Sequence, residues 1–456
     1  MKFTKKPLII QRFFYFYIMN NNKVLPYALF ILFLMQVFTA EAQRKKKDKK
    51  DFERSPKQEL VYDDKAYLPV IRTVQFYPQG KENQLPIYTL GSTERLLLTF
   101  DDLRADVRNY YLSIEHCNQD WTPSRTTVLD YIDGFNEDRI DNFQTSRSTF
   151  RSYTQYKLTF PTEYIKPKLA GNYILKVYED ADKSRLVLTR RFYVLNSLMQ
   201  VNSTVQSSYK TTNRLKNQKL NINLTTGLTI QNPQRDLIVQ VKQNQRSDNQ
   251  MILQTPSFVG NNEFRYTNSE TFDFKGNNEF RFVDMRSFRI PSERVQQITQ
   301  DSITQILLYT DEDDSHETYA ATFDENGLYF IRNRDLNDDA LDADYADVTF
   351  SLKTSQTIQG NIYLVGGFNH FQRTEENKLH FDEENQIWKV TLRLKQGLYD
   401  YDYVLEDQQG NVITDAFSGT HFQTGNDYQI FIYNRRPGAY WDELVGFGQN
   451  SINNRN

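Results

Sequence analysis

Short runs of alternating apolar and polar residues fill the chain after residue 60. In one of them Tyr110, Leu112 and Ile114 alternate with Tyr111, Ser113 and Glu115, the period of a strand with one buried face. Turn residues separate the runs, and no long stretch after the first fifty residues has the spacing of an amphipathic helix. This punctuation is typical of an antiparallel β-sandwich. The runs at the beginning of the chain cover residues 71–76, 96–100, 110–114, 156–160, 173–178 and 191–195.

The runs fall into three regions, which we interpret as tandem immunoglobulin-like antiparallel β-sandwich domains of an all-β protein. The expected boundaries are 60–196, 197–340 and 341–446, with a flexible tail at 447–456. Two NNEFR copies, at residues 261–265 and 277–281, suggest equivalent strands in one sheet of the second region. The IYLVGGFNHF run of the third region resembles the early-set, glycogen-binding domains attached to amylases, in fold rather than in ligand.

The beginning of the chain reads as a leader, residues 1–42. An apolar run from Val24 to Phe38 follows Lys23, and Ala40-Glu41-Ala42 offers small residues for cleavage between Ala42 and Gln43. This layout predicts a secretory signal peptide starting at Met19. A basic flexible linker is expected at 43–59, either solvated or a tether to anionic headgroups or to an acidic partner surface. We therefore expect export to a bacterial periplasm.

Composition narrows the class of protein. Tyr and Phe, 29 and 32 residues, favour strands, and one cysteine allows no intramolecular disulfide. Residues 1–42 hold five Lys and Arg and one acidic residue, so the remainder has a net charge of −7. This mild acidity argues against nucleic-acid binding.

The densest group of reactive or bulky residue types lies in residues 110–124, YYLSIEHCNQDWTPS. It contains His116, Cys117, Asp120 and Trp121. A nucleophilic cysteine needs a histidine base within reach, but neighbours on a strand point to opposite faces. We therefore interpret Cys117 as a small buried residue and His116 as a hydrogen-bonding residue at the rim. The acidic run at 311–317 lacks the spacing of a calcium loop, and the motifs of phosphate, dinucleotide and zinc sites are missing. We expect no catalytic residue, cofactor or metal.

The irregular loop between residues 121 and 151 is the better candidate for function. Tyr, Trp and Arg are enriched in protein interfaces, and long loops tend to carry function, although each residue could equally pack on its own domain. The candidate partner-binding residues are Trp121, Tyr131, Phe135, Arg139, Arg147, Arg151 and Tyr153.

Several motifs taken together resemble the type IX secretion system plug proteins. They include residues 110–124, YIDGF at 131–135, SRSTFRSYTQY at 146–156, GNNEFRF at 276–282, LKQGLYDYDY at 394–403 and WDELVG at 441–446. The likeness covers essentially the whole chain after the leader. Ser247 departs from the family pattern, which has a tryptophan there.

The resemblance implies a monomeric, non-enzymatic periplasmic protein. Members of the family bind the periplasmic opening of the very large outer-membrane translocon barrel and close its idle pore. The implied partner is this barrel, with no nucleic acid and no small-molecule substrate. The alternative is a carbohydrate-binding or glycan-processing exported protein that uses its early-set domain.

Overall fold

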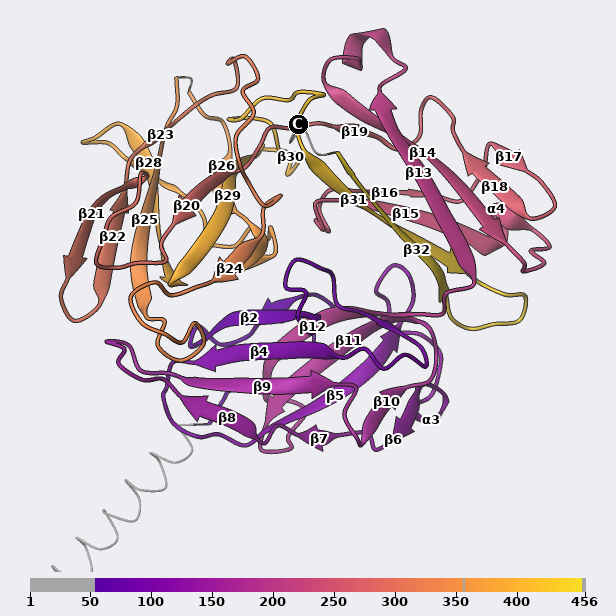
Figure 1. Cartoon of the computed structure of the whole chain (residues 1–456), viewed down its shortest axis with the longest axis horizontal. Helices are drawn as coiled ribbons and strands as arrows, with labels where there is room; N and C mark the ends of the chain where they lie inside the picture. Colours follow the sequence, from indigo (N-terminus) through magenta and orange to yellow (C-terminus); the bar gives the residue numbers. More distant parts are fainter. Residues whose placement is uncertain (1–53, 356, 453–456) are drawn as a thin grey trace, which may run out of the picture. The chain divides into compact units, whose positions relative to one another are not determined.

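Two facing sheets and a small ribbon build the first sandwich. The computed structural model describes residues 54–355 and 357–452, so the expected signal cleavage site at Ala42 and Gln43 lies outside the described residues. One sheet is β1 (Lys65–Ala66), β3 (Ile87–Thr89), β5 (Tyr110–Cys117), β7 (Asp138–Arg139), β11 (Gly171–Glu179) and β12 (Leu186–Leu195). The other is β2 (Ile71–Pro78), β4 (Leu96–Asp102), β8 (Asn142–Thr145) and β9 (Thr154–Phe160) (Figure 1). Beside them, α3 (Val128–Tyr131) leads into a ribbon of β6 (Ile132–Gly134) and β10 (Ile165–Pro167).

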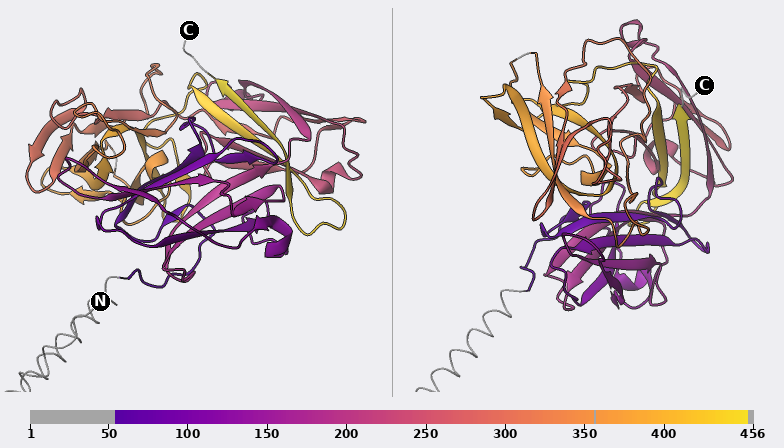
Figure 2. Two further views of the ribbon diagram at one scale, coloured as in Figure 1. Left: turned by 60° about the horizontal axis from the view of Figure 1, so that its bottom comes forward. Right: turned by 60° about the vertical axis from the view of Figure 1, so that its left-hand side comes forward.

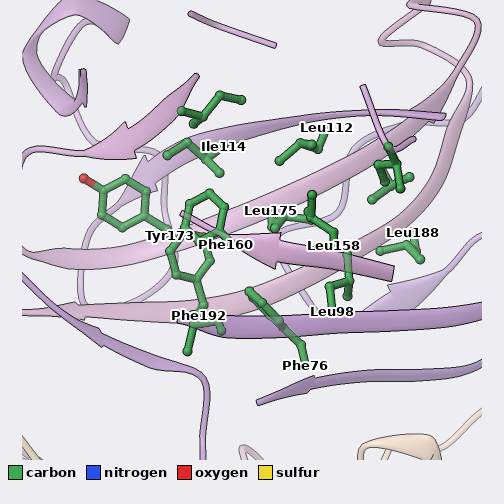
Figure 3. Packing of buried hydrophobic residues seen from close by; sticks show 14 of the residues in the cluster. Phe76, Leu98, Leu112, Ile114, Leu158, Phe160, Tyr173, Leu175, Leu188 and Phe192 are labelled. Carbon is green, nitrogen blue, oxygen red and sulfur yellow. The ribbon is translucent and has the colours of Figure 1, made fainter. Parts of the chain in front are cut away.

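An aromatic cluster fills the core between the two sheets. The ring of Phe192 lies 5.1 Å from that of Phe160 and 5.2 Å from that of Tyr173, centroid to centroid (Figure 3). All three side chains are fully buried, and each comes from an inward position of its strand. Aromatic pairs of this geometry add about 0.5–1.5 kcal/mol beyond the burial of their area. The alternation in the sequence therefore marks the core-facing positions of this sandwich.

The second sandwich is discontinuous in sequence. One sheet is β13 (Met199–Ser207), β14 (Asn217–Thr226), β17 (Phe258–Val259), β18 (Glu263–Tyr266) and β19 (Asp273–Lys275). The other combines β15 (Leu237–Gln243) and β16 (Gln250–Leu253) with the C-terminal strands β31 (Asn426–Asn434) and β32 (Glu443–Ile452). In Figures 1 and 2 these yellow strands lie beside the magenta strands of this sandwich, and Val239 pairs with Ile432. Two short helices, η1 (Thr211–Asn213) and α4 (Pro233–Asp236), connect its strands.

The third sandwich is inserted between β19 and β31. One sheet is β20 (Arg281–Asp284), β24 (Tyr329–Ile331), β26 (Asn361–Val365), β29 (Gly397–Glu406) and β30 (Val412–Ile413). The other is β21 (Val295–Gln300), β22 (Thr304–Leu308), β23 (Asp311–Glu312), β25 (Tyr345–Lys353), β27 (His380–Asp382) and β28 (Ile387–Lys395). A 3-10 turn, η2 (Gly367–Asn369), follows β26.

The sheets confirm the all-β sandwich prediction but divide the chain differently from the expected tandem order. The expected break at residue 340 falls inside the third sandwich, because β20 to β24 share its sheets and its core. The expected flexible tail begins inside β32, which continues to Ile452. The two NNEFR copies lie in different sandwiches, since Phe264 packs in the second core whereas Phe280 packs in a cluster of the third.

A buried ion pair joins the first and third sandwiches within the compact unit formed by residues 57–456. The Lys395 ammonium lies 2.6 Å from a carboxylate oxygen of Asp101, and both side chains are buried. Tyr345 donates a hydrogen bond of 2.7 Å to the same oxygen, and Lys395 lies 4.1 Å from the centre of the Tyr153 ring. Burial lowers the pKa of Lys395, an effect that the Asp101 carboxylate opposes. We call Asp101, Tyr153, Tyr345 and Lys395 the clasp.

Candidate partner-binding surface

Three of the seven predicted partner-binding residues are buried. Trp121 packs between the first and second sandwiches, with the Arg191 guanidinium 4.4 Å from its ring centre. Tyr131 belongs to the core of the first sandwich. Tyr153 belongs to the clasp, and its hydroxyl donates 2.8 Å hydrogen bonds to the carbonyl oxygens of Ala340 and Ala343. These side chains stabilise the protein's own domains and are not exposed to a partner.

Two further predicted residues contact the third sandwich. The guanidinium of Arg147 lies 2.6 Å from Asp338 and 3.7 Å from Asp342. The backbone amide of Arg151 donates a 3.1 Å hydrogen bond to Asp344. The end of the predicted loop is therefore a contact between sandwiches within this chain.

Phe135 and Arg139 remain exposed. Arg139 pairs with Asp141 at 3.0 Å and donates a 2.9 Å hydrogen bond to the side chain of Asn109. Phe135 is 64% exposed and contacts another surface aromatic, Tyr164, at a ring-centroid distance of 5.8 Å. Of the predicted set, Phe135 is thus the aromatic side chain that the fold leaves on the surface.

The ribbon of β6 and β10 holds this aromatic pair in place. The amide of Phe135 donates a 2.6 Å hydrogen bond to the carbonyl oxygen of Tyr164. Gly134 has a φ of +109°, and a Cβ there would lie 2.0 Å from the same oxygen. Only glycine fits this close approach of the two backbones. The local geometry therefore fixes the two rings on the outside of the sandwich.

Sequence reasoning missed two exposed apolar side chains of this region, Leu129 on α3 and Tyr164 of the aromatic pair. Leu129 stands on α3 and is 83% exposed, and Tyr164 precedes β10 and is 51% exposed. A capping box between Thr127 and Asp130 fixes the beginning of α3, and Lys168 donates a 2.8 Å hydrogen bond to the Leu129 carbonyl. The pairing of β6 with β10, which the sequence does not display, brings Tyr164 to Phe135.

His116 is a neutral structural residue beside a cavity of about 500 Å³. Its Nε2 donates to the carbonyl oxygen of Ala170 at 3.3 Å, so its Nδ1 accepts a 2.9 Å hydrogen bond from Ser124. Burial lowers the pKa of His116 to about 4. A base this weak does not suit proton abstraction at neutral pH, which agrees with the structural interpretation of this residue.

Acid is expected to destabilise the protein through His116. Its folded pKa of about 4 lies below the ordinary value of about 6.5, so the unfolded state binds more protons between these values. The free energy of unfolding should therefore fall as the pH drops from about 6.5 to 4, by about 3 kcal/mol from this residue alone. Urea denaturation at a series of pH values measures the slope. His116→Gln should flatten it, whereas His380→Gln, on the exposed β27, should not; equal slopes in all three proteins would contradict the assignment.

Cys117 is expected to resist thiol reagents in the native protein. It is fully buried between the first and second sandwiches, so a reagent cannot reach it. Burial also raises the pKa of its thiol to about 12, so the reactive thiolate does not form at neutral pH. A chromogenic disulfide reagent should react only after urea is added. Reaction at the same rate with and without urea would show that the thiol is accessible. Cys117→Ser should retain the native spectrum and partner binding.

A cleft of about 900 Å³ lies where the three sandwiches meet. Its charged groups are largely paired with one another: Arg191 with Asp63 at 2.9 Å, and Arg190 with Asp64 at 3.5 Å. Ser247, the departure from the family pattern, accepts a 3.2 Å hydrogen bond from Lys242 in its wall. Among residues 54–355 and 357–452, no cluster of His, Cys, Asp or Glu could hold a metal ion. Over the same ranges, no helix has the length and apolar character needed to cross a membrane.

Comparison of the sequence and the structure with known proteins identifies related proteins. A crystal structure of a hypothetical protein from Parabacteroides merdae ATCC 43184 superposes with a TM-score of 0.82 at 28% identity, covering 86% of this chain and all of that one. A 1,4-alpha-glucan branching enzyme, GlgB 1, from Clostridium perfringens (strain SM101 / Type A) is 39% identical over 57 residues, 12% of this chain and 8% of the enzyme. Residues 71–196, the first sandwich almost entirely, match the family "Type 9 secretion system plug protein 1st domain". Through these residues, the chain carries a first domain of the type 9 secretion system plug protein kind.

Proposed function

We propose that this protein is a non-enzymatic periplasmic plug of the type IX secretion system. It binds the periplasmic opening of the outer-membrane translocon barrel and closes the pore when no cargo occupies it. The observation that carries the proposal is the match of residues 71–196 to the plug family.

The physical requirements of a plug agree with the fold. A wide water-filled barrel leaks unless its opening is covered, so the domains of the covering protein have to hold a fixed arrangement. The clasp joins two of the sandwiches through a buried ion pair, and the Trp121 cluster joins the first sandwich to the second. Binding to the barrel also has to be reversible, which favours an interface of limited size with a polar rim.

Co-purification tests the proposal directly. The protein, tagged at its C-terminus, is recovered from detergent-solubilised outer membranes, and the proteins bound to it are identified. We expect a very large β-barrel protein in stoichiometric amount. A deletion strain should admit large antibiotics that the parent excludes, and the full-length gene should restore exclusion. Absence of the barrel together with unchanged permeability would refute the plug.

Glycan binding is the second candidate. The short similarity to a glucan branching enzyme favours it, although the chain spans only 8% of that enzyme's length. Isothermal titration of the full-length protein with maltoheptaose and a glycan array would test it. Saturable binding would support this function, and absence of binding in both assays would exclude it.

A further inference from the structure

We infer that the cleft where the three sandwiches meet binds an organic carboxylate, and that the Lys242 ammonium is the group that holds it. The cleft has a volume of about 900 Å³. Sites for small molecules typically have volumes of about 300–1,000 Å³, so the cleft is large enough for such a ligand. The test needs only the purified protein, so its outcome is independent of the plug function.

Lys242 is a buried cation without a counter-ion. It stands on β15, lines the cleft and is 2% exposed. Its ammonium donates hydrogen bonds of 3.0 Å to the Tyr193 hydroxyl and 3.2 Å to the Ser247 hydroxyl. Among residues 54–355 and 357–452, no carboxylate oxygen lies within 4 Å of this ammonium, and no third acceptor is hydrogen-bonded to it. Lysine is almost never fully buried unless its charge is paired, which makes an anion the expected partner of this ammonium.

Other charged groups of the cleft wall either have partners or are exposed. Lys65 and Asp120 line the cleft as exposed residues, so water solvates their charges. An anion that enters the cleft therefore meets a buried positive charge without a carboxylate at Lys242. The remaining cations of the wall each have a carboxylate oxygen within 4 Å: Arg72 with Glu376, Arg190 with Asp64, Arg191 with Asp63, Arg373 with Glu406, Arg393 with Asp347 and Lys395 with Asp101.

The charge and the walls of the site favour an organic carboxylate. One buried positive charge balances a carboxylate better than a phosphate monoester, which carries almost two negative charges at neutral pH. The ring of Tyr193, whose hydroxyl contacts Lys242, lies 5.4 Å from that of Trp121, and both line the cleft together with Leu85 and Pro86. Apolar walls with a few polar groups that fix orientation are typical of small-molecule sites. The ligand therefore carries an apolar or aromatic body next to its carboxylate, as a free carboxylic acid or the carboxyl terminus of a peptide does.

Isothermal titration of the purified protein tests the class of ligand. The probes are N-acetylphenylalanine, its uncharged amide, phenyl phosphate and a short peptide that ends in phenylalanine. The two carboxylates are expected to bind saturably, and the amide and phenyl phosphate at least about tenfold more weakly. Tighter binding of the peptide than of the acid would identify a peptide terminus as the ligand, and equal binding a free acid. Absence of saturable binding by both carboxylates, or tighter binding of phenyl phosphate, would overturn the inference.

Lys242→Met separates a binding lysine from a structural one. Methionine retains the apolar stem and removes the charge, so binding of N-acetylphenylalanine should weaken at least about tenfold. The melting temperature without ligand should not fall, because an uncompensated buried charge destabilises a fold. A lysine that only joined the sandwiches would give a lower melting temperature and unchanged binding, which would overturn the inference. Lys353→Met, at an exposed position of β25, is the control and should bind the acid like wild type.

Ser247→Asp places a carboxylate of the chain itself beside Lys242. The Ser247 hydroxyl lies 3.2 Å from the ammonium, so an aspartate there competes with the ligand. This variant should bind N-acetylphenylalanine at least about tenfold more weakly than Ser247→Asn, which has the same size and no charge. It should also melt at a higher temperature than Ser247→Asn, because its charge pairs with the buried ammonium. Binding of the acid by Ser247→Asp as strong as that by Ser247→Asn would overturn the assignment to Lys242.

Discussion

Asp101→Ala is expected to lower the free energy of unfolding by about 3–5 kcal/mol, the typical loss when one partner of a buried ion pair is removed. The carboxylate accepts hydrogen bonds from Lys395 at 2.6 Å and from Tyr345 at 2.7 Å, on an oxygen shielded from water. Without it, the Lys395 ammonium is buried with the Ala340 carbonyl, 2.9 Å away, as its remaining hydrogen-bond acceptor. The first and third sandwiches should then separate more readily, or Lys395 should lose its proton.

Urea denaturation compares this variant with a matched control. Asp347→Ala removes a pair of similar distance, Asp347 with Arg393 at 2.8 Å, from a partly exposed face of the third sandwich, and should cost at most about 1 kcal/mol. The double variant Asp101→Leu with Lys395→Met should recover most of the loss, because apolar residues replace both charges. An Asp101→Ala protein as stable as the Asp347→Ala protein would contradict the importance of the clasp.

Gly171→Ala is the second variant with a large expected effect, about 3 kcal/mol or more of lost stability. Gly171 begins β11 with a φ of +147°, and a Cβ there would lie 2.6 Å from Nε2 of His116 and 2.9 Å from the Asp442 carbonyl oxygen. The added methyl group therefore strains the backbone and pushes His116 and the second sandwich away from the first.

Thermal unfolding and hydrogen exchange measure this effect. Protection should fall at β5 and β11 and at the segment before β32, where the crowded groups lie. Gly410→Ala is the control, because its turn also has a positive φ, +83°, but no atom lies within 4 Å of the added Cβ. A loss no larger than that of Gly410→Ala would mean that the crowding relaxes at little cost.

Strand positions could be predicted from the sequence because alternation is a local property. The run YQIFIY at residues 428–433 is typical of a strand, but nothing in it identifies the strand that pairs with it. The pairing of Val239 with Ile432 spans almost two hundred residues, and both runs are apolar enough to suit any buried sheet. The periodicity of the sequence therefore does not predict that the third sandwich is inserted within the second.

The candidate site was predictable only in part, for a related reason. Tyrosine and arginine stabilise contacts within a chain as well as between chains, so composition could not separate Tyr153, in the clasp, from Phe135, on the surface. Tyr164 lay outside the predicted loop and reached Phe135 through a pairing between short strands. Burial agrees with the structural role predicted for Cys117, whereas His116, expected at the rim, lies inside the fold with 1% of its surface exposed.

Because the second sandwich is discontinuous in sequence, its strands become available for folding at different times. During synthesis, β15 emerges well before β31, so its edge waits about 180 residues for the strand that pairs with it. The third sandwich can fold within that interval, and its two connections meet where the His421 amide donates a 2.8 Å hydrogen bond to the Asn277 carbonyl. Closing the second sandwich then becomes a nearly local step. Until that moment β15 has one edge without its final partner, and an unpaired sheet edge is a site where chains pair wrongly and aggregate.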